Sequence, residues 1–171
     1  MKKHNNKRKI FICTTFRDFT GTENDEIQKL FLKSLKDQTY RNFELVVTIF
    51  KEKNIERVVK EFVSPVKFYY DFAQDYKYSH TEVLLNCIKE AYKMLSNTII
   101  IWTTADVIFE NNFFEIINNY LSQNSVAIIH PHYIYRNIND FIKDCNSILT
   151  LRSGMDVVVF DGSLFYNKNI L

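Results

Sequence analysis

Three short segments of this chain are almost entirely apolar and rich in β-branched residues: 9–14, 43–49 and 98–103. A continuous apolar run of this length predicts a strand buried on both faces, rather than a strand with one face in water. Amphipathic stretches at 25–38, 54–62 and 79–95 alternate with these strands. This alternation predicts an α/β fold with a mostly parallel central sheet and helices on both faces, a three-layer sandwich. Further strands are expected at 66–70, 126–130 and 157–160, and a further helix after Asn112.

Length and composition agree with one folded domain covering residues 1–171. Hydrophobic residues make up 46% of the chain, which is enough for a sizeable core. With Gly 3 and Pro 2, the collagen-like, Gly-rich linker and Pro-rich disordered classes are excluded.

The charge balance does not favour nucleic acid as a partner. Net charge is +2, and lysines and arginines alternate with acids along the expected helices. A basic run precedes the first strand, and it predicts a solvated terminus or, alternatively, a contact with acidic lipid headgroups. Its members are Lys2, Lys3, Lys7, Arg8 and Lys9.

Membrane insertion and a disulfide framework are not expected. No apolar run reaches the roughly 18 residues that a spanning helix needs, and no signal peptide is recognised before the first strand. Cys13, Cys87 and Cys145 are odd in number and lack CxxC spacing, which predicts buried thiols. The expected location is therefore cytoplasmic, with at most a peripheral contact at the inner membrane face.

The third apolar segment ends at a single carboxylate, Asp106. Asn112 and Glu115 follow in the spacing of a capping box, so a helix is expected to begin there. In open α/β sheets, ligands bind in the crevice outside the carboxyl ends of the strands. A carboxylate at that place suits a hard divalent cation that holds a phosphate, and this predicts a nucleotide-handling site. The alternative is a turn or cap carboxylate.

Other polar side chains follow the first two strands. Thr14, Thr15 and Arg17 come at the end of segment 9–14, and Thr48 comes near the end of segment 43–49. If these strands are neighbours of the one before Asp106, all five side chains line one crevice. They offer hydroxyl and guanidinium donors for phosphate and one carboxylate for Mg²⁺ or Mn²⁺. The alternative for each threonine is that it only ends a strand or caps a loop.

Three segments, in chain order, resemble the family 2-type glycosyltransferases of GT-A fold, a Rossmann-like sandwich. Residues 14–17 (TTFR) followed by 31–47 (FLKSLKDQTYRNFELVV) resemble the family's opening, in which a helix runs into S-L-x-x-Q-T-Y-x-N-F-E. Residues 85–91 (LNCIKEA) resemble its R-N-x-G-I-x-x-A helix. Residues 102–108 (WTTADVI) resemble its F-L-D-A-D-V-I segment, which carries the DxD metal motif.

The resemblance implies transfer of a sugar, typically a hexose, from a nucleoside-diphosphate donor to an acceptor hydroxyl. Asp106 matches the second acid of the DxD motif, which ligates Mg²⁺ or Mn²⁺, and Thr104 stands at the first. The family's loop that approaches the nucleotide matches Thr15, Phe16 and Arg17, and the asparagine of its helix matches Asn86. These four residues are the remaining substrate-binding candidates. The implied acceptor is a glycan, a lipid or a protein, as in polysaccharide biosynthesis.

The chain also departs from the family pattern. Thr104 replaces an acid, Leu85 replaces an arginine, and the second strand ends in residues 48–51 (TIFK) where an acidic pair is usual. The sequence stops near where the acceptor-side half of such a domain is expected. A minimal transferase, part of a longer protein and an inactive relative all remain open. A non-catalytic domain that binds a nucleotide or a partner protein is the alternative function; a flavodoxin-like module lacks a phosphate motif after its first strand.

Beyond the resemblance, two further groups of residues are candidates. Asp156 follows Gly154 and precedes a strand, in the region where the family keeps its acceptor-side acid, so it is the candidate general base. His130 and His132 stand two residues apart on an extended chain, which points both to one side. They are candidate metal ligands or phosphate contacts, or alternatively only a polar strand end.

Overall fold

The computed structural model describes residues 7–17, 19–21, 23–50, 54–71, 80–92, 94, 97–129 and 157–165. These residues form six strands, four α-helices and one 3₁₀ helix. In chain order the elements are β1 (Lys9–Thr14), α1 (Glu23–Lys36), β2 (Phe43–Ile49), α2 (Ile55–Phe62), β3 (Val66–Tyr70), α3 (His80–Tyr92), β4 (Thr98–Trp102), α4 (Phe113–Tyr120), β5 (Val126–Ile129), β6 (Val157–Asp161) and η1 (Gly162–Phe165).

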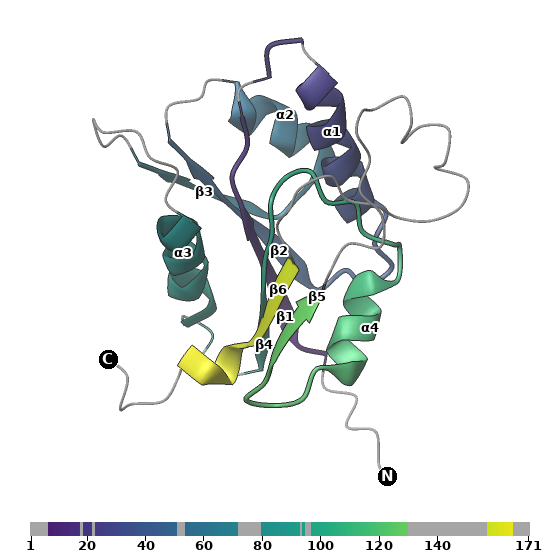
Figure 1. Cartoon of the computed structure of the whole chain (residues 1–171), viewed down its shortest axis with the longest axis vertical. Helices are drawn as coiled ribbons and strands as arrows, with labels where there is room; N and C mark the ends of the chain where they lie inside the picture. The colour runs from purple at the N-terminus through teal and green to yellow at the C-terminus, as the bar shows by residue number, and fades with distance from the viewer. Residues whose placement is uncertain are drawn as a thin grey trace.

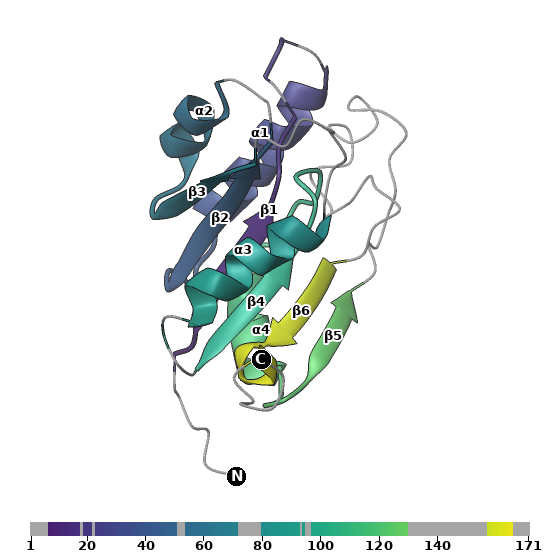
Figure 2. The ribbon, with the colours of Figure 1, turned by 90° about the vertical axis from the view of Figure 1, so that its left-hand side faces the viewer.

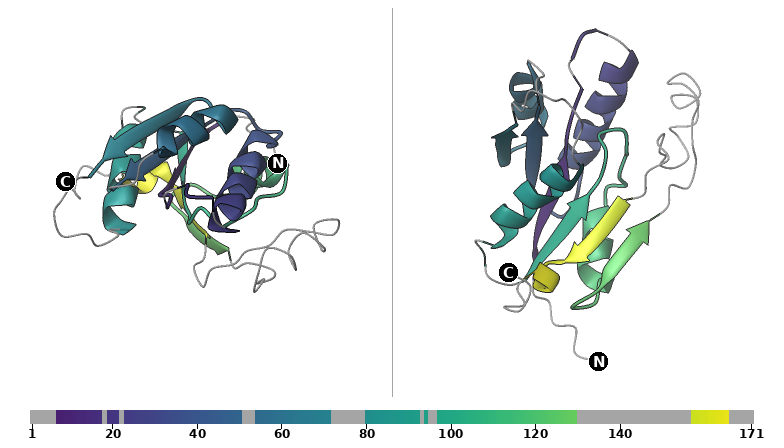
Figure 3. Two further views of the ribbon diagram at one scale, coloured as in Figure 1. Left: turned by 90° about the horizontal axis from the view of Figure 1, so that it is seen from above. Right: turned by 60° about the vertical axis from the view of Figure 1, so that its left-hand side comes forward.

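The strands form one mixed sheet in the order β3-β2-β1-β4-β6-β5. Strands β1 to β4 pair in parallel, whereas β6 runs antiparallel to both of its neighbours, β4 and β5. Figure 3 shows β5 and β6 extending the sheet on the side away from β3. The fold is thus α/β and Rossmann-like, with a mostly parallel sheet, as the sequence predicts.

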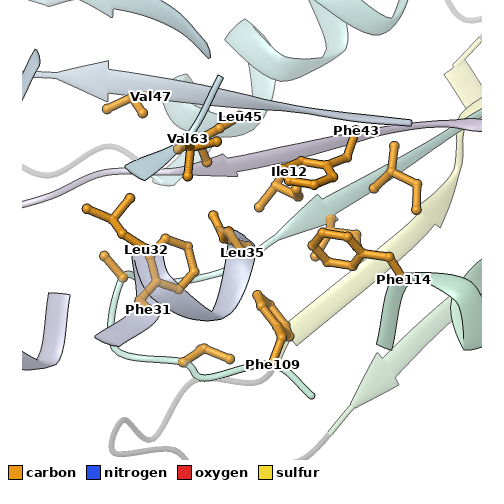
Figure 4. Close-up of a cluster of buried hydrophobic side chains, with 14 of the residues drawn as sticks. Ile12, Phe31, Leu32, Leu35, Phe43, Leu45, Val47, Val63, Phe109 and Phe114 are labelled. Atoms are coloured by element: carbon orange, nitrogen blue, oxygen red, sulfur yellow. The ribbon is translucent and has the colours of Figure 1, made fainter. Parts of the chain in front are cut away.

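Helices cover both faces of this sheet. Figure 1 and Figure 2 show α3 on one face and α1 and α4 on the other. Alternate residues of each central strand therefore enter different cores: Ile12 faces α1 and α4, whereas Cys13 faces α3. Figure 4 shows the larger cluster, in which Phe31 and Leu35 of α1 and Phe114 of α4 pack onto the sheet. Burial on both faces explains why the central strands read as unbroken apolar runs.

Predicted and observed bounds agree closely for the strands and less well for the helix starts. Helix α1 begins at Glu23, two residues before the predicted start. Helix α4 begins after Asn112 as predicted, and Asn54 takes the same position before α2, but neither asparagine makes a side-chain cap hydrogen bond, so the predicted capping box at Asn112 is wrong. Asn54 has φ 64, in the left-handed region. The carboxylate of Glu115 instead accepts a hydrogen bond from Thr39 Oγ1 at 3.4 Å, so it does not complete a capping box.

The basic run at the start of β1 is not simply a solvated terminus, because the Arg8 side chain is largely buried and makes contacts within the fold. Its guanidinium pairs with Asp161 at the end of β6, 3.0 Å between Nη1 and Oδ2, with the two side chains 12% and 5% exposed. Its Nη2 also donates to the carbonyls of Asn118 (2.7 Å) and Leu121 (3.0 Å), at the end of α4. Lys9 lies 3.6 Å from Glu44. The expectation that Arg8 and Lys9 face water or lipid headgroups is therefore wrong; Lys2 and Lys3 lie outside the described residues.

Substituting Arg8 by Met should destabilise the fold by about 3 kcal/mol, because Asp161 is left buried without its counter-charge. Urea unfolding measures this loss. Arg8→Met combined with Asp161→Asn should lose less than the sum of the two single variants. Lys29→Met, which breaks the exposed pair with Glu26, serves as the control and should change stability little. An equal effect of Arg8→Met and Lys29→Met would refute the importance of the buried pair.

Beneath α3 lies a buried pair of thiols, Cys13 and Cys87. Burial raises the pKa of the Cys87 thiol well above its usual value, and the hydrogen bond with Cys13 raises it further. Both thiols are buried in the core, in agreement with the expectation from the sequence. Cys145 lies outside the described residues. In the described part of the chain, no helix has the length and apolar character needed to cross a membrane.

The raised pKa of Cys87 makes stability depend on alkaline pH. Above about pH 8.5 the thiol ionises in the unfolded chain but not in the native one, so stability falls as pH rises. Urea midpoints measured from pH 7.5 to 10.5 should fall more steeply for the wild type than for Cys87→Ala. The comparison uses slopes, so the packing loss at the substituted site does not enter. Parallel slopes would show that this thiol does not contribute.

Candidate functional site

The topological switch point of the sheet lies between β1 and β4. From β1 the chain builds outward through β2 to β3, then returns to place β4 on the other side of β1. Pairing continues beyond the strand ends, since Thr103 N donates to Cys13 O at 3.2 Å. Figure 3 shows the loops after β1 and β4 at the same end of the molecule. The predicted adjacency of the three strands is confirmed, and their carboxyl ends meet where such sheets bind ligands.

Asp106 lies in the loop after β4, with its side chain partly exposed. Burial alternates along this loop: Thr103, Ala105 and Val107 are buried, whereas Thr104 and Asp106 are partly exposed. Ala105 and Asp106 form a turn, and the two partly exposed side chains, Thr104 and Asp106, meet there. The Thr104 hydroxyl donates a hydrogen bond to Oδ1 of Asp106. The carboxylate is therefore oriented by its neighbour and is not part of the core.

The loop that carries Asp106 is fixed to α1 by Gln38, which is fully buried. Gln38 Nε2 donates to the carbonyls of Ser34 (3.1 Å) and Glu110 (2.5 Å), and Oε1 accepts from Phe114 N at 3.1 Å. All three partners are backbone groups. Phe114 N lies in the first turn of α4, where a helix offers no acceptor of its own, whereas Glu110 O also accepts from Phe113 N at 3.0 Å. One side chain thus joins the end of α1, the Asp106 loop and the first turn of α4.

The loop after β1 contributes a different arrangement. The Thr15 hydroxyl oxygen is inaccessible to solvent and has no hydrogen-bond partner among the described residues. The Phe16 ring is 1% exposed and packs against Phe31 of α1, so it anchors the loop in the core and does not face a ligand. The Arg17 side chain is exposed. Of this segment, the Arg17 guanidinium is the group exposed for ligand contact, whereas the Thr15 hydroxyl oxygen is covered.

Thr14, Thr48 and Asn86 are not brought to the crevice surface. Thr14 is fully buried on the face of β1 that α1 covers, together with Ile12. Thr48 is fully buried on the opposite face, where its Oγ1 accepts from Asn86 Nδ2 of α3 at 3.1 Å. The predicted crevice therefore needs correction for these residues, because successive strand positions alternate between faces. Thr48 and Asn86 join α3 to β2.

Three candidate residues, His130, His132 and Asp156, lie outside the described residues. Within the part of the chain that the structure describes, no group of three or more His, Cys, Asp or Glu side chains is placed to hold a metal ion. Mg²⁺ is commonly bound through one or two carboxylates together with substrate phosphates and water. Asp106 alone fits a cation that arrives with a diphosphate, and it does not fit a site built from protein ligands only.

Two glutamines that the sequence analysis did not single out hold the site in place. Gln38 belongs to the Q-T-Y-R-N-F-E segment, which resembles the family motif, but the motif does not indicate that this side chain bonds to the loop after β4. Gln28 of α1 pairs with the backbone of Arg17 on both sides: Oε1 accepts from Arg17 N at 2.7 Å, and Nε2 donates to Arg17 O at 3.2 Å. No sequence pattern marks Gln28, because its partner is a backbone group.

The sequence matches no protein-family model and no curated protein. The structure is similar to 4-diphosphocytidyl-2C-methyl-D-erythritol synthase from Anaerococcus prevotii, with TM-score 0.50 and 11% identity over 94% of this chain and 73% of that one. A cytidylyltransferase from Leptospira borgpetersenii gives TM-score 0.49 and 16% identity over 92% of this chain. Mouse xyloside xylosyltransferase 1 gives TM-score 0.36 and 12% identity over 95% of this chain and 69% of that one. The chain spans 62% of the length of the Leptospira protein. At 11% identity, the likeness to the Anaerococcus synthase shows the fold alone.

Replacing Gln38 by Leu should destabilise the chain by about 3 kcal/mol, because buried backbone groups lose their partners. Urea unfolding measures the loss, and faster amide exchange at Phe114 locates it. The neighbouring Thr39→Val is the control: its backbone N–H still donates to Asn111 O at 2.7 Å, and only an exposed hydroxyl is lost. If both variants were equally stable, the Gln38 amide would not be the clamp that its contacts indicate.

Proposed function

We propose that this chain is a glycosyltransferase-like enzyme that binds a nucleoside-diphosphate sugar at the carboxyl ends of β1 and β4 and transfers the sugar to an acceptor hydroxyl. One observation carries the proposal: a partly exposed carboxylate, Asp106, lies in the loop after β4 at the switch point of a Rossmann-like sheet. The resemblance of residues 102–108 to the DxD segment supports it, as does the fold shared with the Anaerococcus synthase.

In this proposal each group acts on the donor diphosphate or the acceptor. Asp106 would hold Mg²⁺ or Mn²⁺, which would supply positive charge against the departing diphosphate. The exposed guanidinium of Arg17 donates to phosphate oxygens. Asp156, outside the described residues, is proposed as the base that takes the acceptor proton. The acceptor is proposed to be a glycan, a lipid or a protein.

Because Thr104 stands where the family motif has an acid, the proposed site has one carboxylate, and this affects how it binds a cation. With one carboxylate, the protein alone binds a divalent cation weakly, and phosphate oxygens complete the coordination. Cation and diphosphate then strengthen each other's binding by the same factor, as linkage requires. The contact from Thr104 to Asp106 also favours a second candidate, a domain that binds a nucleotide without transfer, because it satisfies one carboxylate oxygen without any cation.

Replacing Asp106 by Asn should lower metal-dependent turnover by about 100-fold, because the amide oxygen is a poor substitute for a charged ligand. Asn retains an acceptor for the Thr104 hydroxyl, so the fold should remain intact. Turnover is measured as Mn²⁺-dependent hydrolysis and transfer over a panel of nucleoside-diphosphate sugars. Calorimetry with the matching diphosphates, with and without Mn²⁺, measures the coupling.

Glu110→Gln is the matched control, since Glu110 is an exposed carboxylate in the same loop. Its turnover should equal that of the wild type. Diphosphate binding without hydrolysis or transfer in the wild type would favour the non-catalytic domain. Unchanged turnover in Asp106→Asn would remove the metal role from this residue, and absence of all nucleotide binding would refute both functions.

A further inference from the structure

The Gln28 side chain acts on the loop after β1 as a short neighbouring strand would. Its amide oxygen accepts from Arg17 N at 2.7 Å, and its amide nitrogen donates to Arg17 O at 3.2 Å. Gln28 is 6% exposed, so water competes little for these two bonds. Pairing both backbone groups of one residue fixes the direction in which that residue's side chain leaves the loop.

The rest of this loop is anchored on either side of Arg17. Phe16 lies in the core against Phe31 and Phe19. Further along, Gly21 N donates to Asp25 Oδ2, in the first turns of α1. Gly21 has φ 85, a backbone conformation that glycine adopts without strain. Between these anchors the Arg17 backbone is held by Gln28 alone among the described side chains.

The Arg17 side chain itself is not used by the fold. It is exposed, and among the described residues no ion pair or hydrogen bond involves its guanidinium. A guanidinium that lies at the surface, at the carboxyl end of β1, is a donor suited to phosphate oxygens.

We propose that Gln28 is a positioning residue, which holds the Arg17 backbone so that the guanidinium is presented to the diphosphate of the ligand. This rests on the proposed function for the identity of the ligand as a nucleoside diphosphate. It adds a specific division of roles: Arg17 contacts the phosphate, and Gln28 contributes to affinity only through Arg17. A guanidinium that is already oriented loses less conformational freedom on binding.

The test uses the full chain and inorganic pyrophosphate as the probe, with EDTA present so that cation binding does not contribute. Arg17→Ala should weaken pyrophosphate binding about 30-fold, as expected for loss of a charge-assisted contact. Gln28→Leu keeps the size of the buried side chain but removes both hydrogen bonds, and should weaken binding about tenfold. Calorimetry measures both dissociation constants.

A double-mutant cycle separates positioning from a general structural role. If Gln28 acts through Arg17, Gln28→Leu has no further effect on pyrophosphate affinity in an Arg17→Ala background. Ser34→Ala is the matched control: Ser34 is also 6% exposed on α1, but its hydroxyl bonds to Phe31 O within the helix. It should leave affinity unchanged. An equal loss from Gln28→Leu in both backgrounds would overturn the proposal.

Gln28→Glu adds a readout that a purely structural role does not produce. A protonated carboxyl reproduces both contacts, accepting from Arg17 N and donating to Arg17 O, whereas a carboxylate places an oxygen against Arg17 O. The ratio of its pyrophosphate dissociation constant to that of the wild type should be about tenfold at pH 8 and should fall to near unity once the pH is below the pKa of the introduced glutamate, which burial raises. A ratio independent of pH would count against the proposal.

Failure of this inference and failure of the proposed function are distinguishable. Loss of pyrophosphate binding in Arg17→Ala and Gln28→Leu, with no transfer from any nucleotide sugar, supports the positioning role and refutes the transferase. Transfer by the wild type, together with unchanged pyrophosphate affinity in both variants, supports the transferase and refutes the positioning role of Gln28. Absence of pyrophosphate binding in the wild type refutes the anion site, and Gln28 as its positioning residue, directly.

Discussion

The position of the candidate site depends on one buried amide. Gln38 has no exposure, and its two ends are used for three backbone groups, on α1, on the loop after β4 and on α4. Because an unpaired amide or backbone group in the interior is strongly unfavourable, this set of bonds allows one register between α1 and the loop. Phe109, in the same loop, adds ring contacts with Phe31 of α1 and Phe114 of α4. The position of the loop that carries Asp106 is therefore fixed by these buried contacts of Gln38 and Phe109.

The segment of the sequence that most resembles the glycosyltransferase family serves this scaffold. Within Q-T-Y-R-N-F-E, Gln38 clamps the loop, Tyr40 OH donates to Arg8 O at 2.5 Å, and Phe43 packs edge-on against Phe114. The departures from the family instead fall at positions assigned to chemistry, such as Thr104. The motif is thus evidence for how the chain folds, and it is weaker evidence for what the site does. This agrees with a structural likeness that is measurable at 11% identity.

Strand bounds and the place of Asp106 could be predicted from the sequence because both follow from local pattern. An unbroken apolar run predicts a strand, and the first carboxylate after it lies beyond the carboxyl end of that strand. Which face a side chain occupies requires the register of pairing, and so Thr14 and Thr48 were assigned to one crevice although they lie on opposite faces. The pair of Arg8 and Asp161 is 153 residues apart in the chain, and no local pattern could predict it.

Thr104 stands where the family motif has an acid, and this difference changes the charge of the site more than its shape. Two carboxylates that meet at one turn of a loop repel each other, and they are stable together only when a cation or protonation offsets the repulsion. A hydroxyl at the same place donates to Asp106 and leaves a single negative charge. The Asp106 carboxylate is therefore already hydrogen-bonded in the protein alone. Under the proposed function, phosphate oxygens of the ligand would supply the remaining coordination of a cation, so cation and diphosphate would each strengthen binding of the other.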